Sequence, residues 1–279
     1  MHTTIMTNGT EKGLGIFADF HTHILPGIDD GALNVEESVA MLLEERRQAD
    51  LLFGENSRCI VFLTPHFKSY NQTVDEFLLN RVKAMADLRN AIETHKDPQV
   101  RRLAETVELV PGAEILVHSE LESVEGLDRL FMGESNILLF EFSEGYFSSS
   151  YIQVIERLCY KYKAGPMLAH FERYASFMQR EDYHALMSLN RIIFQFNTKH
   201  ILPKGDKGLC KHMSSPSVDL VLKFFRYGVP MVPGSDCHDP EERKPDCING
   251  YVNAKKFMKK AEYSRFLAGT QGLAEAIAT

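Results

Sequence analysis

The sequence predicts an α/β fold built on a parallel sheet, either closed as a barrel or left open. Short apolar runs alternate with amphipathic helical stretches along the chain of 279 residues, a pattern typical of folds in which helices cover a parallel sheet. Histidine and acidic side chains follow several of the apolar runs directly. The apolar fraction of 44% and the charged fraction of 25% are ordinary for a globular protein with a large core.

Apolar runs, helix caps and helical periodicity locate the elements in chain order. Strands are predicted over residues 15–20, 59–63, 107–110, 137–142, 166–170, 191–196 and 229–232. Helices are predicted over residues 35–53, 73–96 and 151–162. Asn34 and Glu37 have the spacing of a capping box at the start of the first helix. The residues of the second helix that are expected to face the core are Phe77, Val82, Met85 and Leu88.

The domain organisation follows from length and composition. The chain length fits one large α/β domain or two small ones, and no low-complexity linker divides it. Residues 202–208 contain one proline and two glycines and are predicted to be a loop within the domain. We therefore expect one domain over residues 15–279. Residues 1–14 lack the apolar segment of a secretion signal and are expected to be a flexible tail.

Charge and cysteine content exclude several classes of function. The net charge of -7 argues against an extended nucleic-acid surface. No apolar run reaches the roughly 20 residues needed to cross a bilayer, so no membrane insertion is expected. Five cysteines without a Cys-x-x-Cys pair argue against a disulfide framework or a structural zinc knot. The better interpretation is that these cysteines are reduced thiols of a cytoplasmic protein.

The most informative motif follows the first predicted strand. His21 and His23 lie two residues apart, and on an extended strand they point to the same face. Gly27 and Gly31 flank a loop that returns Asp29 and Asp30 to the end of that strand. Two imidazoles and nearby carboxylates at one strand end favour a metal site over a pair of ordinary surface histidines.

Further candidate ligands follow the other predicted strands. They are His66, Glu114, Glu141, His170, Asp236 and His238. In a parallel α/β barrel the carboxyl ends of the strands converge on one face, where active sites are found. Each residue alone has a structural explanation, as a core histidine or as a partner of a nearby cation. Together they predict nitrogen and carboxylate ligands for manganese, iron or zinc at more than one position.

Two arginines accompany these ligands. Arg173 lies three residues after His170, and Arg243 lies five residues after His238. A guanidinium group at a metal site favours phosphate, because its planar fork matches two phosphate oxygens. The alternative is a structural ion pair, for example between Arg173 and Glu172 or Glu181.

Together these motifs resemble those of the polymerase and histidinol phosphatase (PHP) superfamily. Within it, the chain is similar to the bacterial manganese-dependent protein-tyrosine phosphatases of capsule and exopolysaccharide synthesis. The matching segments, which lie between about residues 16 and 250, are 19–32, 64–66, 112–114, 139–142, 169–174 and 234–238. The resemblance implies a distorted barrel of seven strands, the (β/α)7 TIM-like barrel of the PHP type, forming one metallophosphatase domain.

The resemblance also implies a three-metal centre, with manganese favoured and iron or zinc as alternatives. The first metal would take His21, His23, Glu114 and Asp236. The second would share Glu114 and add His66 with Glu141 or His170. The third would use Asp30, His170 and His238. Arg173 and Arg243 occupy the positions of phosphate-binding arginines in the family.

The implied reaction is hydrolysis of phosphotyrosine on a protein by a hydroxide that bridges the metals. Asp30 or His238 would assist the leaving tyrosyl oxygen. The implied partner is a bacterial tyrosine kinase of polysaccharide export. Alternatives are a small-molecule phosphatase acting on a substrate such as histidinol phosphate, a metallo-amidohydrolase, and a metal-stabilised binding module.

Three segments depart from the family pattern. Phe67 follows His66 where the family often has a second histidine, residues 91–106 form a longer and more charged insert, and residues 197–200 replace a short turn of small residues. We expect all three near the substrate entrance. The insert and the acidic surface are also compatible with a homo-oligomer.

Overall fold

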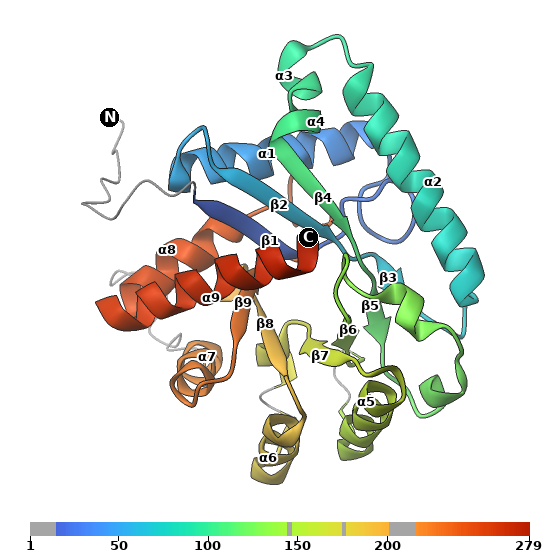
Figure 1. Cartoon of the computed structure of the whole chain (residues 1–279), viewed down its shortest axis with the longest axis vertical. Helices are drawn as coiled ribbons and strands as arrows, with labels where there is room; N and C mark the ends of the chain where they lie inside the picture. The colour runs from blue at the N-terminus through green and yellow to red at the C-terminus, as the bar shows by residue number, and fades with distance from the viewer. Residues whose placement is uncertain (1–14, 144–146, 175–176, 201–215) are drawn as a thin grey trace.

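The strands that the structure describes are all parallel and form two sheets (Figure 1). The structure is a computed structural model and describes residues 15–143, 147–174, 177–200 and 216–279. The strands are β1 (Ile16–Thr22), β2 (Arg58–Leu63), β3 (His66–Phe67), β4 (Val107–Pro111), β5 (Glu114–Leu116), β6 (Ile137–Glu141), β7 (Gly165–Leu168), β8 (Ile193–Asn197) and β9 (Met231–Gly234). One sheet has the order β1–β2–β4, and the other has the order β3–β5–β6–β7–β8–β9.

The two sheets meet at the carboxyl ends of the first sheet's strands. β2 leads directly into β3, and β4 leads directly into β5. At the other side, the His23 amide donates to the Cys237 carbonyl at 2.9 Å and the Asp236 amide donates to the His21 carbonyl at 2.8 Å. These bonds join the end of β1 to the segment after β9. The predicted α/β class with parallel strands is confirmed, with the strands divided between two sheets.

Helices surround the strands on the outside (Figure 1). They are α1 (Val35–Phe53), α2 (Val74–Glu93), α3 (Pro98–Arg101), α4 (Leu103–Thr106), α5 (Ser149–Tyr162), α6 (Arg180–Ser188), α7 (Pro216–Arg226), α8 (Cys247–Phe257) and α9 (Lys260–Ala278). The Asn34 side chain accepts from the Glu37 amide at the start of α1, as its spacing predicts. Thr73 and Glu76 form a capping box at the start of α2.

Two sequence predictions about these elements are wrong. Val82 was expected in the core, but it is 65% exposed. The buried stripe of α2 runs through Phe77, Met85 and Leu88, and Val82 lies five residues from Phe77, on the other side of the helix. The strand predicted over 166–170 ends at Leu168, because His170 has a φ of 30° and leaves the extended conformation.

The insert over residues 91–106 lies away from the site. It contains α3 and α4, and α4 leads directly into the amino end of β4. The candidate site lies at the carboxyl ends of the strands, so the expectation that this insert borders the substrate entrance is wrong. Residues 197–200, by contrast, line the pocket described below through Lys199 and His200.

Apolar side chains pack on both sides of the strands, in one larger and one smaller cluster. The smaller cluster lies among the strands and includes Phe20 stacked on Phe62, with ring centroids 4.7 Å apart. Ala274 and Ile277 of α9 belong to the same cluster, and the Gln271 side chain donates to the Ile16 carbonyl. Helix α9 therefore covers the amino ends of the strands, while the opposite ends carry the polar site.

The predicted tail over residues 1–14, the predicted loop over 202–208 and Cys210 all lie outside the described residues. In the part of the chain that the structure describes, no helix combines the length and the low polarity that a membrane span requires.

Candidate metal centre

The strand ends bring nine candidate ligands to one place. His21 lies within β1, with His23 just after it, His66 begins β3, Glu114 begins β5, Glu141 ends β6, His170 follows β7, and Asp236 and His238 follow β9, while Asp30 comes from the loop after β1. Most of these side chains are buried, whereas that of Asp30 is 64% exposed. The structure therefore brings together every residue that the sequence predicts as a metal ligand.

Glu114 lies at the centre of the cluster. Its Oε2 is 3.1 Å from His21 Nε2 and 3.3 Å from His23 Nε2. The same oxygen is 3.0 Å from His66 Nδ1, and Oε1 is 2.8 Å from His170 Nε2. One carboxylate thus faces four imidazoles, which is the arrangement expected of a residue that bridges metal ions.

Asp236 forms a second centre on the same face. Its Oδ1 is 3.5 Å from His23 Nε2 and 3.7 Å from His238 Nδ1. Arg173 donates to Oδ2 at 2.5 Å, and Arg243 donates to Oδ1 at 3.2 Å. The arginines are therefore connected to the cluster through Asp236, and not to Glu172 as in the ion pair considered from the sequence.

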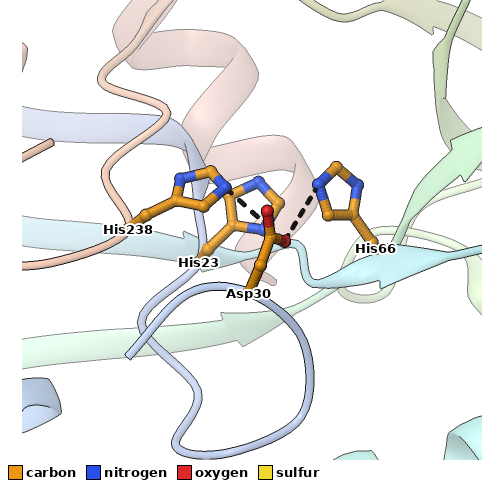
Figure 2. A group of neighbouring side chains, drawn as sticks. All are labelled: His23, Asp30, His66 and His238. Carbon is orange, nitrogen blue, oxygen red and sulfur yellow. Dashed lines mark ion pairs between the residues drawn. The ribbon is translucent and has the colours of Figure 1, made fainter. Parts of the chain in front are cut away.

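Asp30 closes the exposed side of the cluster (Figure 2). Its Oδ1 is 3.4 Å from His66 Nε2 and 3.9 Å from His238 Nε2, and His23 lies beside them. Figure 2 shows three imidazoles gathered around this one carboxylate: His23 from the segment after β1, His66 from β3 and His238 from the segment after β9.

The ligand atoms fall into four overlapping groups, each within 4.8 Å. They are His23, Asp30, His66 and His238; His21, His23 and Asp236; His21, Glu114 and His170; and His66, Glu114 and Glu141. Asp30 and His238 thus gather with His23 and His66, whereas His170 lies beside His21 and Glu114. The implied partition had placed His170 with Asp30 and His238.

Side chains behind the ligands hold the imidazole rings in place. Asp29 Oδ2 accepts from His23 Nδ1 at 2.7 Å and from the His66 amide at 2.9 Å. Gln195 Oε1 lies 3.0 Å from His21 Nδ1 and accepts from the His170 amide at 2.7 Å. Sequence reasoning did not identify Gln195, since it lies between two core phenylalanines on β8. Such supporting bonds orient the remaining ring nitrogen toward a metal.

The backbone of the site is strained and closely packed. His170 and Asp236 have φ values of 30° and 54°, a region that non-glycine residues rarely adopt. A Cβ on Gly31 would lie 2.1 Å from the His23 carbonyl oxygen, so only glycine fits there. Strain of this kind is concentrated at functional sites.

The carboxylates of the cluster stabilise positive charge on the groups beside them. Burial opposes protonation of His66, but Glu114 and Glu141 outweigh burial and raise its pKa to about 11. Burial likewise opposes protonation of His23, and Asp29 raises its pKa to about 9. Burial and the charge of His23 lower the pKa of His238 to about 3. Bound metal cations would balance the charge of these carboxylates while the imidazoles remain neutral.

Several buried polar atoms of the described structure lie close to one another but make no hydrogen bond of acceptable geometry. They include Glu114 Oε2, His66 Nδ1 and His238 Nε2. Unsatisfied buried polar atoms are rare in folded proteins and call for an explanation. All three belong to the groups above, so the residues present fit metal binding.

A pocket of about 900 Å³ opens over the cluster. Its cationic lining residues are Lys68, Arg173, Lys199 and Arg243, and its aromatic ones include Tyr70, Phe142, Tyr174 and Phe177. Cys237 is fully buried, and burial holds the pKa of its thiol well above the ordinary value. The pocket lining suits a substrate with an anionic head and an aromatic body. Because Cys237 is buried and its thiol stays protonated, it is not placed to act as a nucleophile.

Comparison with known proteins places the chain in a family. Residues 17–270 match the model of the family described as capsular polysaccharide synthesis, CpsB/CapC. The chain is 27% identical over 250 residues to the tyrosine-protein phosphatase CpsB of Streptococcus pneumoniae, covering 88% of this chain and 93% of that protein.

A solved structure supports the fold. It describes YwqE from Bacillus subtilis and CpsB from Streptococcus pneumoniae as unique metal-dependent tyrosine phosphatases. The match has a TM-score of 0.63 at 21% identity and covers 94% of each chain. The arrangement of helices and strands seen here is thus shared with that structure.

Proposed function

The chain belongs to the CpsB/CapC family of capsular polysaccharide synthesis, and on this premise we propose that it is a metal-dependent phosphatase that hydrolyses phosphotyrosine on a protein. The observation that carries the proposal is the cluster around Glu114, where buried imidazoles and carboxylates converge below a pocket with two arginines. The names of the relatives, both tyrosine phosphatases, support the same activity.

The proposed metal ligands are the nine side chains of the cluster. They are His21, His23, Asp30, His66, Glu114, Glu141, His170, Asp236 and His238. Manganese is proposed as the metal at three positions, with iron or zinc as alternatives, because mixed imidazole and carboxylate ligands suit all of them. When bound, the metals lower the pKa of a coordinated water toward neutrality and so supply a nucleophile for phosphorus.

The arginines are proposed to bind the phosphate. Arg173 and Arg243 line the pocket, and both donate to Asp236 at the edge of the cluster. Their guanidinium groups can turn to phosphate oxygens that lie above Asp236, and they neutralise the charge that develops in the transition state. This arrangement holds the ester so that phosphorus faces the cluster.

The leaving tyrosyl oxygen needs a proton or a metal contact as the ester bond breaks. We propose that Asp30 or His238 assists it, because they lie at the exposed side of the cluster with Oδ1 and Nε2 3.9 Å apart. As proposed metal ligands, these two atoms can hold a metal ion or a water beside that oxygen, and the water supplies the proton.

The aromatic lining favours phosphotyrosine over histidinol phosphate. Tyr70 and Phe177 are 65% and 45% exposed and line the pocket, where they can flank a phenyl ring. We propose that the natural substrate is a bacterial tyrosine kinase of polysaccharide synthesis, and that the reaction takes place in the cytoplasm. The free cysteines Cys59, Cys159, Cys237 and Cys247 support that location.

The fold proposals follow the same family. We propose that residues 15–279 form one domain, in which the two sheets together make a distorted barrel of seven strands when β2 with β3, and β4 with β5, each count as one strand. The pairing of Thr22 with Cys237 and the continuation of β2 into β3 support this arrangement.

The test is a comparison of substrates on manganese-loaded enzyme. We expect phosphotyrosine peptides to be hydrolysed with a kcat/KM at least about a hundredfold above that for histidinol phosphate or phosphoserine peptides. A preference for histidinol phosphate would refute the phosphotyrosine proposal and favour a small-molecule phosphatase.

A further inference from the structure

The turn η4 (Thr198–His200) places Lys199 at the pocket, and hydrogen bonds on both sides of Lys199 hold the backbone of the turn in position. Glu172, which is buried, accepts from the Asn197 amide at 3.1 Å and from His200 Nδ1 at 2.7 Å. On the other side, the Thr198 hydroxyl donates to Asp246. Lys199 lies between these contacts and lines the pocket. Its backbone is therefore held before any substrate arrives.

Lys199 has no acidic partner of its own among the residues that the structure describes. Among the described residues, none places a carboxylate within 4.0 Å of its ammonium group, whereas Arg173 and Arg243 both donate to Asp236. Partial burial, together with the charges of the two arginines, lowers the pKa of Lys199 from its ordinary value despite the opposing attraction of Asp236. A partly buried cation among other cations is stabilised when an anion binds beside it.

Two cations of the pocket have no role in the proposed phosphate binding. Arg173 and Arg243 are proposed to bind the phosphate, whereas Lys68 and Lys199 line the pocket without such a role. Of these two lysines, Lys199 lies on the same side of the pocket as Arg173, because the turn that contains Arg173 shares Glu172 with η4. A second anionic group on the substrate would account for Lys199 at this place.

We propose that Lys199 is a specificity-determining residue that binds an acidic side chain next to the phosphotyrosine of a peptide substrate. The inference rests on the proposed function and narrows it to acidic phosphotyrosine segments. Peptide side chains one or two residues from the phosphotyrosine lie within reach, because consecutive Cα atoms are only about 3.8 Å apart.

The experiment compares four substrates: p-nitrophenyl phosphate, and phosphotyrosine peptides flanked by Ala, by Glu or by Lys. We expect the wild type to prefer the Glu-flanked peptide over the Ala-flanked one by about fivefold in kcat/KM, which converts to about 1 kcal/mol. Lys199→Met should abolish that preference and leave turnover of p-nitrophenyl phosphate within about twofold of wild type. Lys199→Glu should favour the Lys-flanked peptide, and Lys199→Arg should retain the wild-type preference.

The controls separate this inference from the proposed function. Lys223→Met removes an exposed lysine of α7, outside the pocket, and should leave all four rates unchanged. An equal loss on every substrate in Lys199→Met would place Lys199 on the transferred phosphate and overturn the inference. Equal wild-type rates on the Ala- and Glu-flanked peptides would also overturn it while leaving the phosphatase intact. Turnover of p-nitrophenyl phosphate but of no peptide would refute the proposed function itself.

Discussion

Removing the carboxylate of Asp29 should weaken metal binding although Asp29 is not a proposed ligand. Its oxygens accept from His23 Nδ1 at 2.7 Å, from the His66 amide at 2.9 Å and from the Gly31 amide at 3.0 Å. Asp29→Ala leaves all three donors without this partner and frees the His23 ring to turn. Loss of a supporting partner of this kind costs about 10- to 100-fold in metal affinity or activity. We therefore expect a loss of about 1.4 to 2.7 kcal/mol in metal binding.

The assay is a titration of metal-free enzyme with manganese, followed by turnover of p-nitrophenyl phosphate. Asp29→Ala should require about 10- to 100-fold more manganese for half activation, and Asp29→Asn, which keeps a neutral acceptor, should lie between it and the wild type. Asp87→Ala removes an exposed carboxylate that pairs with Lys83 on α2, and it should titrate like the wild type. An unchanged titration for Asp29→Ala, in a protein that unfolds at the wild-type temperature, would refute the role of Asp29.

Four further substitutions test other parts of the site. His66→Ala should lower kcat at least about a hundredfold with an unchanged circular dichroism spectrum; full activity would exclude His66 as a ligand. Arg173→Lys should lower kcat/KM for phosphotyrosine peptides about a hundredfold, because lysine lacks the planar fork; wild-type kinetics would contradict phosphate binding by this arginine. Gly31→Ala would place a Cβ 2.1 Å from the His23 carbonyl oxygen, so urea unfolding should show a loss of about 2 kcal/mol. Phe177→Ala should raise KM for phosphotyrosine peptides about fivefold without changing kcat; an unchanged KM would place the tyrosyl ring elsewhere.

Local patterns made the first part of the site predictable. His21 and His23 share a strand face, and Gly31 turns the chain so that Asp29 and Asp30 return to it. Those features depend on residues that are close in sequence. In the structure Asp29 contacts His23, and Gly31 packs against the His23 carbonyl oxygen. The parallel α/β class was predictable for the same reason, because alternating strands and helices are visible in a single sequence.

Other parts of the site depend on contacts that no local pattern reveals. Gln195 holds His21 and the His170 amide, yet on β8 it lies between two phenylalanines and is typical of a core strand. Asp30 contacts His66 and His238, which come from distant segments, so its neighbours follow only from the complete fold. Sequence periodicity also does not indicate the positive φ of His170 that ends β7 early.

The last helix, α9, was not predicted from the sequence, and its composition explains why. α9 contains Gly269 and Gly272, which weaken an isolated helix by about 1 kcal/mol each relative to alanine. Packing of Phe266, Ala274 and Ile277 against the strands compensates for that low propensity. Such tertiary stabilisation is not visible in the helix sequence alone.

The metal content of the purified protein is the most direct test of the central claim. Plasma mass spectrometry should find two or three metal ions per chain, chelation should abolish turnover of p-nitrophenyl phosphate, and manganese should restore it. Chelated protein that contains no metal and still hydrolyses p-nitrophenyl phosphate at the original rate would contradict the account.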